Sequence, residues 1–261
     1  PPTSVDQIPS YIDPTAFNIV LAWIEYSNRS LGVLVGLSII VLNIIAICYF
    51  RKETKLLISA ILSLILVVAN GGLGAIVVSS ILNPFLVSLH MILALMLVSV
   101  LSYACIESYK LIHEDKFKNL QGSRALSNSL ILFWLLIFIE ILLGTGIRTN
   151  LELISIDNPL LSKGELLNAL DSYKYFHSFL GFTLLFLSIY IYAKLKNHNL
   201  FIAKFLGIFI LGMIIVQIFL GEMMVFFELP QLTRLFHTWG SSWLVGIIII
   251  LYNCISNERS K

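Results

Sequence analysis

Seven long apolar stretches dominate this sequence and constrain its fold more than any other feature. They run approximately over residues 30–50, 56–78, 85–107, 126–147, 175–193, 201–225 and 232–253. About 20 apolar residues in a helix cross hydrocarbon roughly 30 Å thick. The first helix is expected to begin before residue 30, because residues 18–24 are also apolar. The runs are continuous, without two-residue alternation, which excludes a β-barrel.

The composition supports the same class. Hydrophobic residues make up 58% of the 261 residues and charged residues only 12%, against about 45–50% and about 25% in soluble proteins. Such a chain has too few charged residues to cover the surface of a globular protein in water. This excludes a soluble enzyme, a disordered protein and a nucleic-acid binder. Cys48, Cys105 and Cys254 fall in or beside apolar runs, so no disulfide framework is expected. The predicted fold class is an all-α polytopic membrane protein in contact with membrane lipid.

Basic residues are distributed unevenly between the two sets of connecting segments. Twelve of the 17 Lys and Arg residues lie in one set, which includes the C-terminus, and five lie in the other. Cytoplasmic loops of membrane proteins are enriched in Lys and Arg. The C-terminus is therefore predicted to be cytoplasmic and, with seven spans, the N-terminus to lie outside. The expected location is a bacterial inner membrane.

An internal repeat relates the two halves of the chain. Residues 73–90 (LGAIVVSSILNPFLVSLH) align without a gap to residues 220–237 (LGEMMVFFELPQLTRLFH), and residues 23–32 align to 172–181. His90 and His237 are 147 positions apart and Tyr26 and Tyr175 are 149 apart, so one duplication explains both blocks. The fourth span has no partner in the repeat unless another helix precedes Pro1.

We therefore predict two pseudo-symmetric four-helix bundles in tandem, with seven spans visible and an eighth before Pro1. Residues 1–110 form the predicted N-terminal bundle, and residues 125–254 form the predicted C-terminal bundle.

Three histidines are candidate ligands. His90, His177 and His237 each lie within the first two turns of an apolar stretch, whereas His113 and His198 lie in Lys-rich connections and are interpreted as solvated. A histidine within a membrane helix is usually functional, although one alone can be a hydrogen-bonded core residue. His177 and His237 start helices of the same direction, so their imidazoles are expected at similar depth. This arrangement favours bis-His ligation of a haem, and zinc fits less well because no third or fourth ligand joins the pair.

The N-terminal half differs at one ligand position. His90 aligns with His237, but Asn28 aligns with His177. Asn is a poor axial ligand for haem iron, so this half is expected to offer one strong protein ligand.

Several motifs resemble the haem A synthase family, whose members oxidise a methyl group of haem O to the formyl group of haem A for cytochrome oxidase. The matching segments are WIEYSNR, LGAIVVSSILNPFLVSLH, EILLGTGIR, YFHSFLG and LPQLTRLFHTWGSSWLVG, which extend from residue 23 to residue 246. The resemblance implies two four-helix bundles with eight spans, haem b as cofactor and haem O as substrate.

The resemblance also implies roles for single residues. His177 and His237 match the pair that holds haem b, His90 matches a ligand of the N-terminal site for substrate haem, and Glu25 matches an acidic residue implicated in catalysis. This sequence departs from the family at Asn28, where the second N-terminal ligand is expected, and in lacking the cysteine pair that many members have before that ligand.

Other charged residues near the predicted sites have two interpretations each. Glu25 lies three residues before Asn28 and shares its helix face, where it could accept a proton; a water-exposed interfacial carboxylate is the alternative. Arg29 and Arg148 are predicted to bind haem propionates, and for Arg234 ordinary interfacial exposure is an equal alternative. Glu140 and Glu222 lie within apolar stretches and are expected to make polar contacts inside the bundle.

The leading hypothesis is therefore a haem A synthase-like membrane oxidoreductase with a bis-His haem b. The alternative is a non-catalytic haem b-binding subunit or assembly factor of a respiratory oxidase. A haem O synthase and respiratory oxidase components are the expected protein partners, and no nucleic acid is expected. A small transporter is disfavoured because the repeats have parallel topology and no apolar stretch is broken at its middle.

Overall fold

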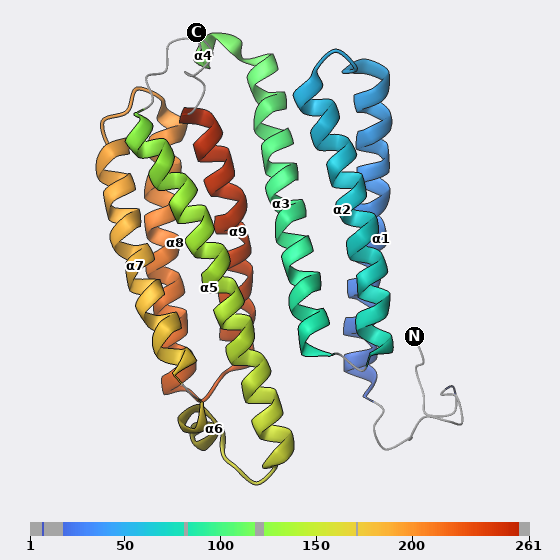
Figure 1. The fold of residues 1–261 in the computed structure, drawn as a ribbon, viewed down its shortest axis with the longest axis vertical. Coiled ribbons are helices and arrows are strands. Elements are labelled where there is room, and N and C mark those ends of the chain that lie inside the picture. Colours follow the sequence, from blue (N-terminus) through green and yellow to red (C-terminus); the bar gives the residue numbers. More distant parts are fainter. Residues whose placement is uncertain (1–6, 8–17, 81–82, 118–122, 171, 256–261) are drawn as a thin grey trace.

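The protein is all-helical throughout the part of the chain that the computed structural model describes, which is residue 7 and residues 18–80, 83–117, 123–170 and 172–255. Seven of its helices are long and apolar enough to cross a membrane (Figure 1). These are α1 (Ile19–Tyr49), α2 (Thr54–Ser79), α3 (Pro84–Ile112), α5 (Arg124–Asp157), α7 (Tyr173–Leu195), α8 (Phe201–Phe226) and α9 (Gln231–Ile255). Two short helices, α4 (Glu114–Phe117) and α6 (Lys163–Ala169), connect them. The prediction of a polytopic all-α membrane protein is confirmed.

The observed helix ends refine the predicted spans. α1 begins at Ile19, as its apolar flank predicts, and the Asn18 side chain caps it by accepting from the amides of Val20 and Leu21. α5 continues ten residues beyond the predicted end at residue 147 and stops at Asp157. Pro159 explains this end, because proline disfavours helical geometry in the residue before it. The prediction for α5 was too short because a membrane helix need not end where its apolar stretch ends.

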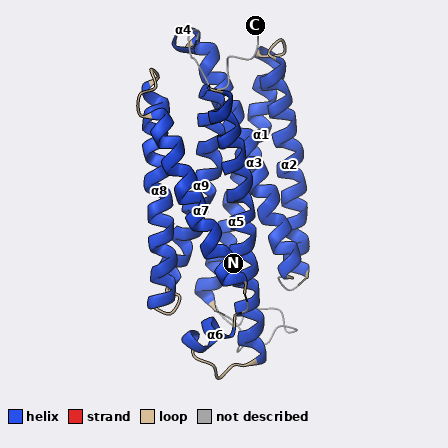
Figure 2. Cartoon of the chain, turned by 60° about the vertical axis from the view of Figure 1, so that its left-hand side comes forward, coloured by secondary structure: helices blue, strands red, loops and turns tan. Residues whose placement is uncertain are grey.

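The helices α5, α7, α8 and α9 form a closed ring in which each packs against two others, and we call this ring the C-terminal bundle. The helices α1, α2 and α3, the N-terminal half, are arranged differently: α2 packs on both α1 and α3, and α3 also packs against α9. Figures 1 and 2 show the long helices running side by side, with α6 at one end of the molecule and α4 at the other. We call these the α6 end and the α4 end.

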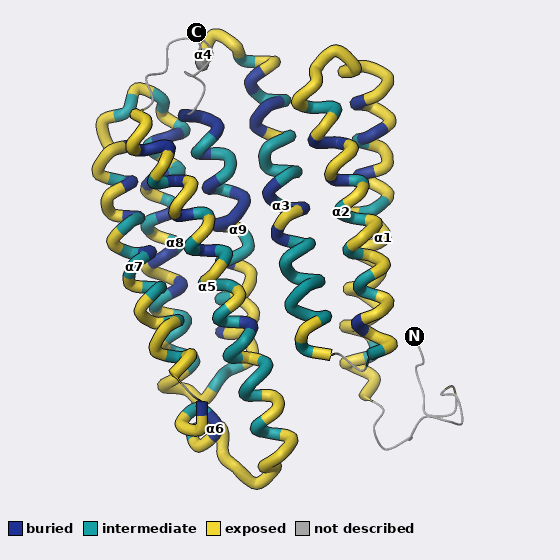
Figure 3. The backbone as a smooth tube through the Cα atoms, viewed as in Figure 1, coloured by how far each residue is buried: buried dark blue, intermediate teal, exposed yellow. Residues whose placement is uncertain are grey.

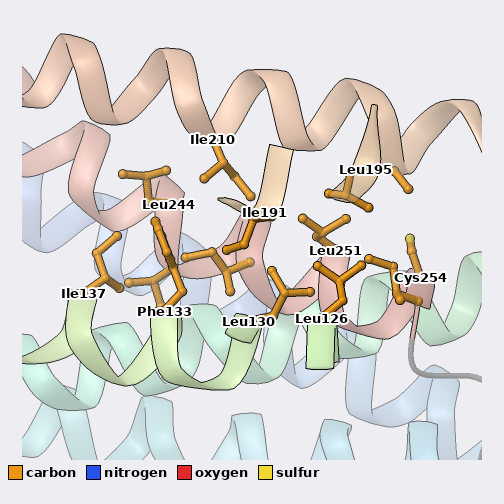
Figure 4. Packing of buried hydrophobic residues seen from close by; sticks show 14 of the residues in the cluster. Leu126, Leu130, Phe133, Ile137, Ile191, Leu195, Ile210, Leu244, Leu251 and Cys254 are labelled. Atoms are coloured by element: carbon orange, nitrogen blue, oxygen red, sulfur yellow. The ribbon is translucent and has the colours of Figure 1, made fainter. Parts of the chain in front are cut away.

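The buried core lies mainly in the C-terminal bundle and where α3 meets α9 (Figure 3). Leu130, Phe133, Ile191, Ile210 and Leu251 are almost completely buried and interdigitate between the helices of the ring (Figure 4). By contrast, most apolar side chains of α1 are exposed in the isolated chain, as expected for a helix that faces lipid.

Small residues allow close helix contacts within this ring and between α9 and α3. A Cβ atom on Gly207 of α8 would lie 2.9 Å from the side chain of Leu195, and one on Gly246 of α9 would lie 2.7 Å from Ser102 of α3. Gly240 of α9 contacts the Gln217 side chain of α8 in the same way. Since lipid is as apolar as these side chains, close packing at small residues determines which membrane helices become neighbours.

A charged cluster joins α2 to α3 near the α4 end. The carboxylate of Glu107 lies 2.8 Å from Nζ of Lys110 and 3.3 Å from Nζ of Lys55. Glu107 and Lys110 are both buried, so each partner compensates a charge that would otherwise be costly. The helix predicted before Pro1 and the C-terminal tail, residues 256–261, lie outside the described residues.

Candidate functional site

His177 and His237 meet inside the C-terminal bundle near its α6 end. His177 lies in the first turns of α7 and His237 in the first turns of α9, and these two helices run in the same direction. Their ring centroids are 6.2 Å apart, with 63° between the ring planes. Both residues are partly buried. The structure thus brings together two of the three candidate histidines.

Each of these rings lies over a glycine of a neighbouring helix. A Cβ atom on Gly144 of α5 would be 3.3 Å from Cε1 of His177, and one on Gly221 of α8 would be 3.8 Å from Cε1 of His237. The four helices of the ring therefore contribute alternately a histidine and a glycine. Because glycine has no side chain, each of these positions leaves space at the helix surface into which an imidazole fits.

An acidic residue completes the His177 side of the site. Oε1 of Glu140, one turn before Gly144 on α5, lies 3.2 Å from Nδ1 of His177. The two side chains are 15% and 22% exposed, respectively. This is the polar contact within the bundle that the sequence predicts for Glu140. Glu222 of α8, for which the same contact is predicted, is exposed instead.

The arrangement fits a haem iron between the two imidazoles. Imidazole nitrogens bind metals at about 2.0–2.1 Å, so one ion between two such rings separates the ring centres by roughly 6 Å. The Nδ1 atoms of both histidines are buried without a hydrogen bond, and Nδ1 of His177 faces Glu140, which leaves Nε2 for a metal. Among the described residues, no three His, Cys, Asp or Glu side chains gather as a metal cluster.

The N-terminal half repeats part of this arrangement. His90 of α3 lies over Gly74 of α2, where a Cβ atom would be 3.2 Å from Cε1 of the ring, and its Nδ1 is also buried and unpartnered. The position equivalent to His177 is Asn28 of α1, which is exposed. It lines an open hollow together with Trp23 and Ile24 of the same helix.

The remaining predicted residues lie at the surface towards the α6 end. Glu25 and Arg29 of α1 form an ion pair across one helical turn, and both are exposed. Arg148 of α5 and Arg234 of α9 are also exposed. No contact within the described residues assigns these arginines to a ligand, so their roles as propionate partners stay predictions.

The sequence alone does not identify the glycines under the histidine rings, nor the amide residues Asn70 and Gln217 that precede two of them by one turn. Gly74 and Gly221 were matched as part of the repeat, but their contact with His90 and His237 was not foreseen. The available signal is a spacing: a polar residue precedes each glycine by four positions, which places the two on one helix face.

Comparison with known proteins identifies one family. The family model COX15-CtaA, described as cytochrome oxidase assembly protein, matches residues 4–249. No curated protein and no solved structure gave a significant match.

Proposed function

Because the chain belongs to the COX15-CtaA family of cytochrome oxidase assembly proteins, the haem A synthase family, we propose that it is a membrane oxidoreductase acting on haem O. In this proposal the methyl group of haem O is oxidised to the formyl group of haem A, a reaction that takes one oxygen atom from water and releases four electrons to an external acceptor and four protons. The observation that supports it best is the His177–His237 pair, whose ring centroids are 6.2 Å apart within a closed four-helix ring.

His177 and His237 would hold haem b, which supplies one-electron redox chemistry when bound. Gly144 and Gly221 leave room for the two rings. Arg148 and Arg234 lie near the same end of the bundle as the histidines and would pair with propionates, because a guanidinium suits a carboxylate.

The N-terminal half would bind substrate haem O, with His90 as the iron ligand. In this half Glu25 would act as the group that accepts a proton near the methyl carbon, and Arg29 would hold its carboxylate through the ion pair they form. Both lie in the first turns of α1, within one turn of Asn28.

Haem extraction tests this activity. The protein should be expressed in cells that also contain a haem O synthase and no other haem A synthase. Haem A, or its hydroxylated intermediate, is expected in the extracts. The Glu25→Ala variant should form neither while keeping the spectrum of the His177/His237 haem. Unchanged haem O with the unmodified protein would contradict the enzymatic proposal.

Asn28 favours a second candidate function. An amide is a weak ligand for haem iron, and Asn28 occupies the position where the repeat places His177 in the other half. A protein that keeps haem b but does not turn over haem O would serve as a haem-binding subunit or assembly factor of a respiratory oxidase. Co-purification of oxidase components with a protein that leaves haem O unchanged would support this alternative.

The proposed orientation places the C-terminus in the cytoplasm and both haem sites towards the outer face of a bacterial inner membrane. Its support is the distribution of basic residues, twelve against five. A reporter fused after Lys261 that is active only on the outer side would reverse this orientation.

A further inference from the structure

A polar residue stands one turn before each glycine that lies under a histidine ring. Since residues four apart share a helix face, each polar side chain is directed towards the same neighbouring helix as its glycine. The three units are Asn70–Gly74 with His90, Glu140–Gly144 with His177, and Gln217–Gly221 with His237. Two of them carry a neutral amide, and one carries an acid.

In the unit that contains Glu140, the contacts between α5 and α7 are reciprocal. His177 of α7 lies over Gly144 of α5, and Glu140 of α5 lies over Gly181 of α7, where a Cβ atom would be 3.4 Å from Oε1 of the carboxylate. Gly181 follows His177 by one turn, just as Gly144 follows Glu140. Two antiparallel helices thus each provide one functional side chain and one space for the other's, which fixes the two groups against each other.

The partners of the polar groups differ between units. Oε1 of Gln217 accepts a hydrogen bond of 3.3 Å from Oγ of Ser241, and its Nε2 is buried without a partner. The His237 ring interacts with the backbone of Gln217 and not with its side chain. For Glu140, Oε1 lies 3.2 Å from Nδ1 of His177, while Oε2 is buried without a partner. The imidazole is therefore the polar group that the structure offers to this buried carboxylate.

The contact has the distance of a hydrogen bond but not its alignment, since Nδ1 of His177 makes none by angle. The imidazole χ2 angle is soft, and a rotation about it directs the N–H at the carboxylate. Histidines that bind a metal generally donate their other ring N–H to a carboxylate or carbonyl, which orients the ring and increases its electron donation.

We propose that Glu140 is a positioning residue for His177: by accepting the Nδ1–H, its carboxylate orients Nε2 towards the iron and lowers the reduction potential of the haem. This inference rests on the proposed bis-His haem b. Stronger donation from an axial ligand stabilises the ferric state, and hydrogen bonding to ligands is one of the means by which proteins set such potentials. His237 has no carboxylate at the equivalent place and interacts with the backbone of Gln217, so the effect of a carboxylate comes from one side of the haem.

Redox titration of the purified, haem-loaded full chain tests the proposal. Glu140→Gln keeps the size and an acceptor oxygen but removes the carboxylate, so the midpoint potential should become more positive while the low-spin spectrum is kept. Glu222→Gln is the matched control, because Glu222 is an exposed acid of α8 beside Gly221. It removes the same formal charge without touching His177, and its midpoint should shift clearly less. Glu140→Asp, which keeps a carboxylate, should have a midpoint between the unmodified protein and Glu140→Gln.

The outcomes separate this inference from the proposed function. An unmodified protein without a low-spin haem would contradict the haem site itself. A haem-loaded protein whose midpoint is the same in Glu140→Gln, or shifts equally in Glu222→Gln, would overturn only the role of Glu140. If Glu140→Gln does not hold haem, retention of haem by Glu140→Asp supports the need for a carboxylate, and loss of haem from both variants overturns the potential-setting role.

Discussion

The C-terminal bundle and the N-terminal half derive from one repeated sequence but reach different arrangements. In the C-terminal bundle, α5 packs against both α7 and α9 and so closes a ring, and the ring brings His177 and His237 together. In the N-terminal half, α2 packs on α1 and α3 in the same way as α8 packs on α7 and α9. His90 lies over its glycine as His237 does, but α1 presents Asn28 instead of a second imidazole.

The comparison separates two requirements of the site, which are the placement of one histidine over a glycine and the pairing of that histidine with a second one. Placing a histidine over a glycine needs only two adjacent helices, and both halves have this element. Pairing two histidines also needs a ligand on each of the two helices that pack against the glycine-bearing helix, which are α7 and α9 in one half and α1 and α3 in the other. The halves therefore differ in the number of ligands each offers, although their local packing is alike.

The largest expected effect is the loss of the paired site. His177→Ala or His237→Ala should abolish the low-spin haem spectrum of the purified protein, because one imidazole cannot supply both axial ligands. The measurement is the optical spectrum of the oxidised and reduced protein. His90→Ala is the control and should keep that spectrum. A low-spin haem that persists in either of the first two variants would break the distinction between the halves.

The difference between the halves can also be tested by giving the N-terminal half a second histidine. Asn28→His should add a second low-spin haem, because His177 shows that an imidazole fits the equivalent position in the repeat. The measurement is the ratio of haem to protein together with the spectrum. If the unmodified protein already binds two bis-His haems, the interpretation of Asn28 is wrong. If only Asn28→His forms haem A, the natural protein is a haem-binding relative that has lost catalysis.

A smaller effect is expected at the glycines under the rings. Gly144→Ala places a Cβ 3.3 Å from His177, so the ring must move by a few tenths of an ångström, whereas Gly221→Ala makes an ordinary contact at 3.8 Å with His237. Overpacking costs about 1–3 kcal/mol, and replacing glycine by alanine within a helix gains up to about 1 kcal/mol. The melting temperature should therefore fall for Gly144→Ala and stay equal or rise for Gly221→Ala. The reverse order would contradict the packing of these rings.

The smallest effect concerns the short helix α6, which precedes α7 in the chain. The side chain of Ser162 accepts from the backbone N–H of Glu165, and the Glu165 carboxylate accepts from the backbone N–H and hydroxyl of Ser162. These bonds lower the pKa of Glu165. A lowered pKa means that the contribution to α6 stability is present above the ordinary pKa of Glu and is lost as pH falls through the lowered value.

Ser162→Ala should therefore increase hydrogen exchange in residues 163–169 at neutral pH, with less difference from the unmodified protein in acid. The haem spectrum should not change, since the exchange effect is confined to α6. An equal difference at both pH values would contradict the role of the carboxylate in this cap.

Much of the site follows from the sequence. The spans are visible because about 20 apolar residues are needed to cross a bilayer. Chain direction alternates at each crossing, so His177 and His237 can be placed at one depth by counting helices. The likeness of the halves and the exception at Asn28 follow from alignment of the chain with itself.

The rest depends on how each helix is rotated about its axis and which helices are its neighbours. In water an apolar face shows which side of a helix is buried, but here both the lipid and the protein interior are apolar, so that signal is weak. Contacts at small residues decide the neighbours instead, as at Gly207, Gly240 and Gly246.

The amino-acid sequence by itself therefore determined the class of protein, its spans, the depth of the histidines and the difference between the halves. Only the tertiary structure decided that the two imidazoles face each other 6.2 Å apart and that Glu140 of α5 lies beside one of them. The physical reason is that the depth of a residue depends on its position along one helix in the bilayer. Whether two side chains face each other depends on how two helices are rotated and packed. This depends on side-chain packing between segments that are far apart in the chain.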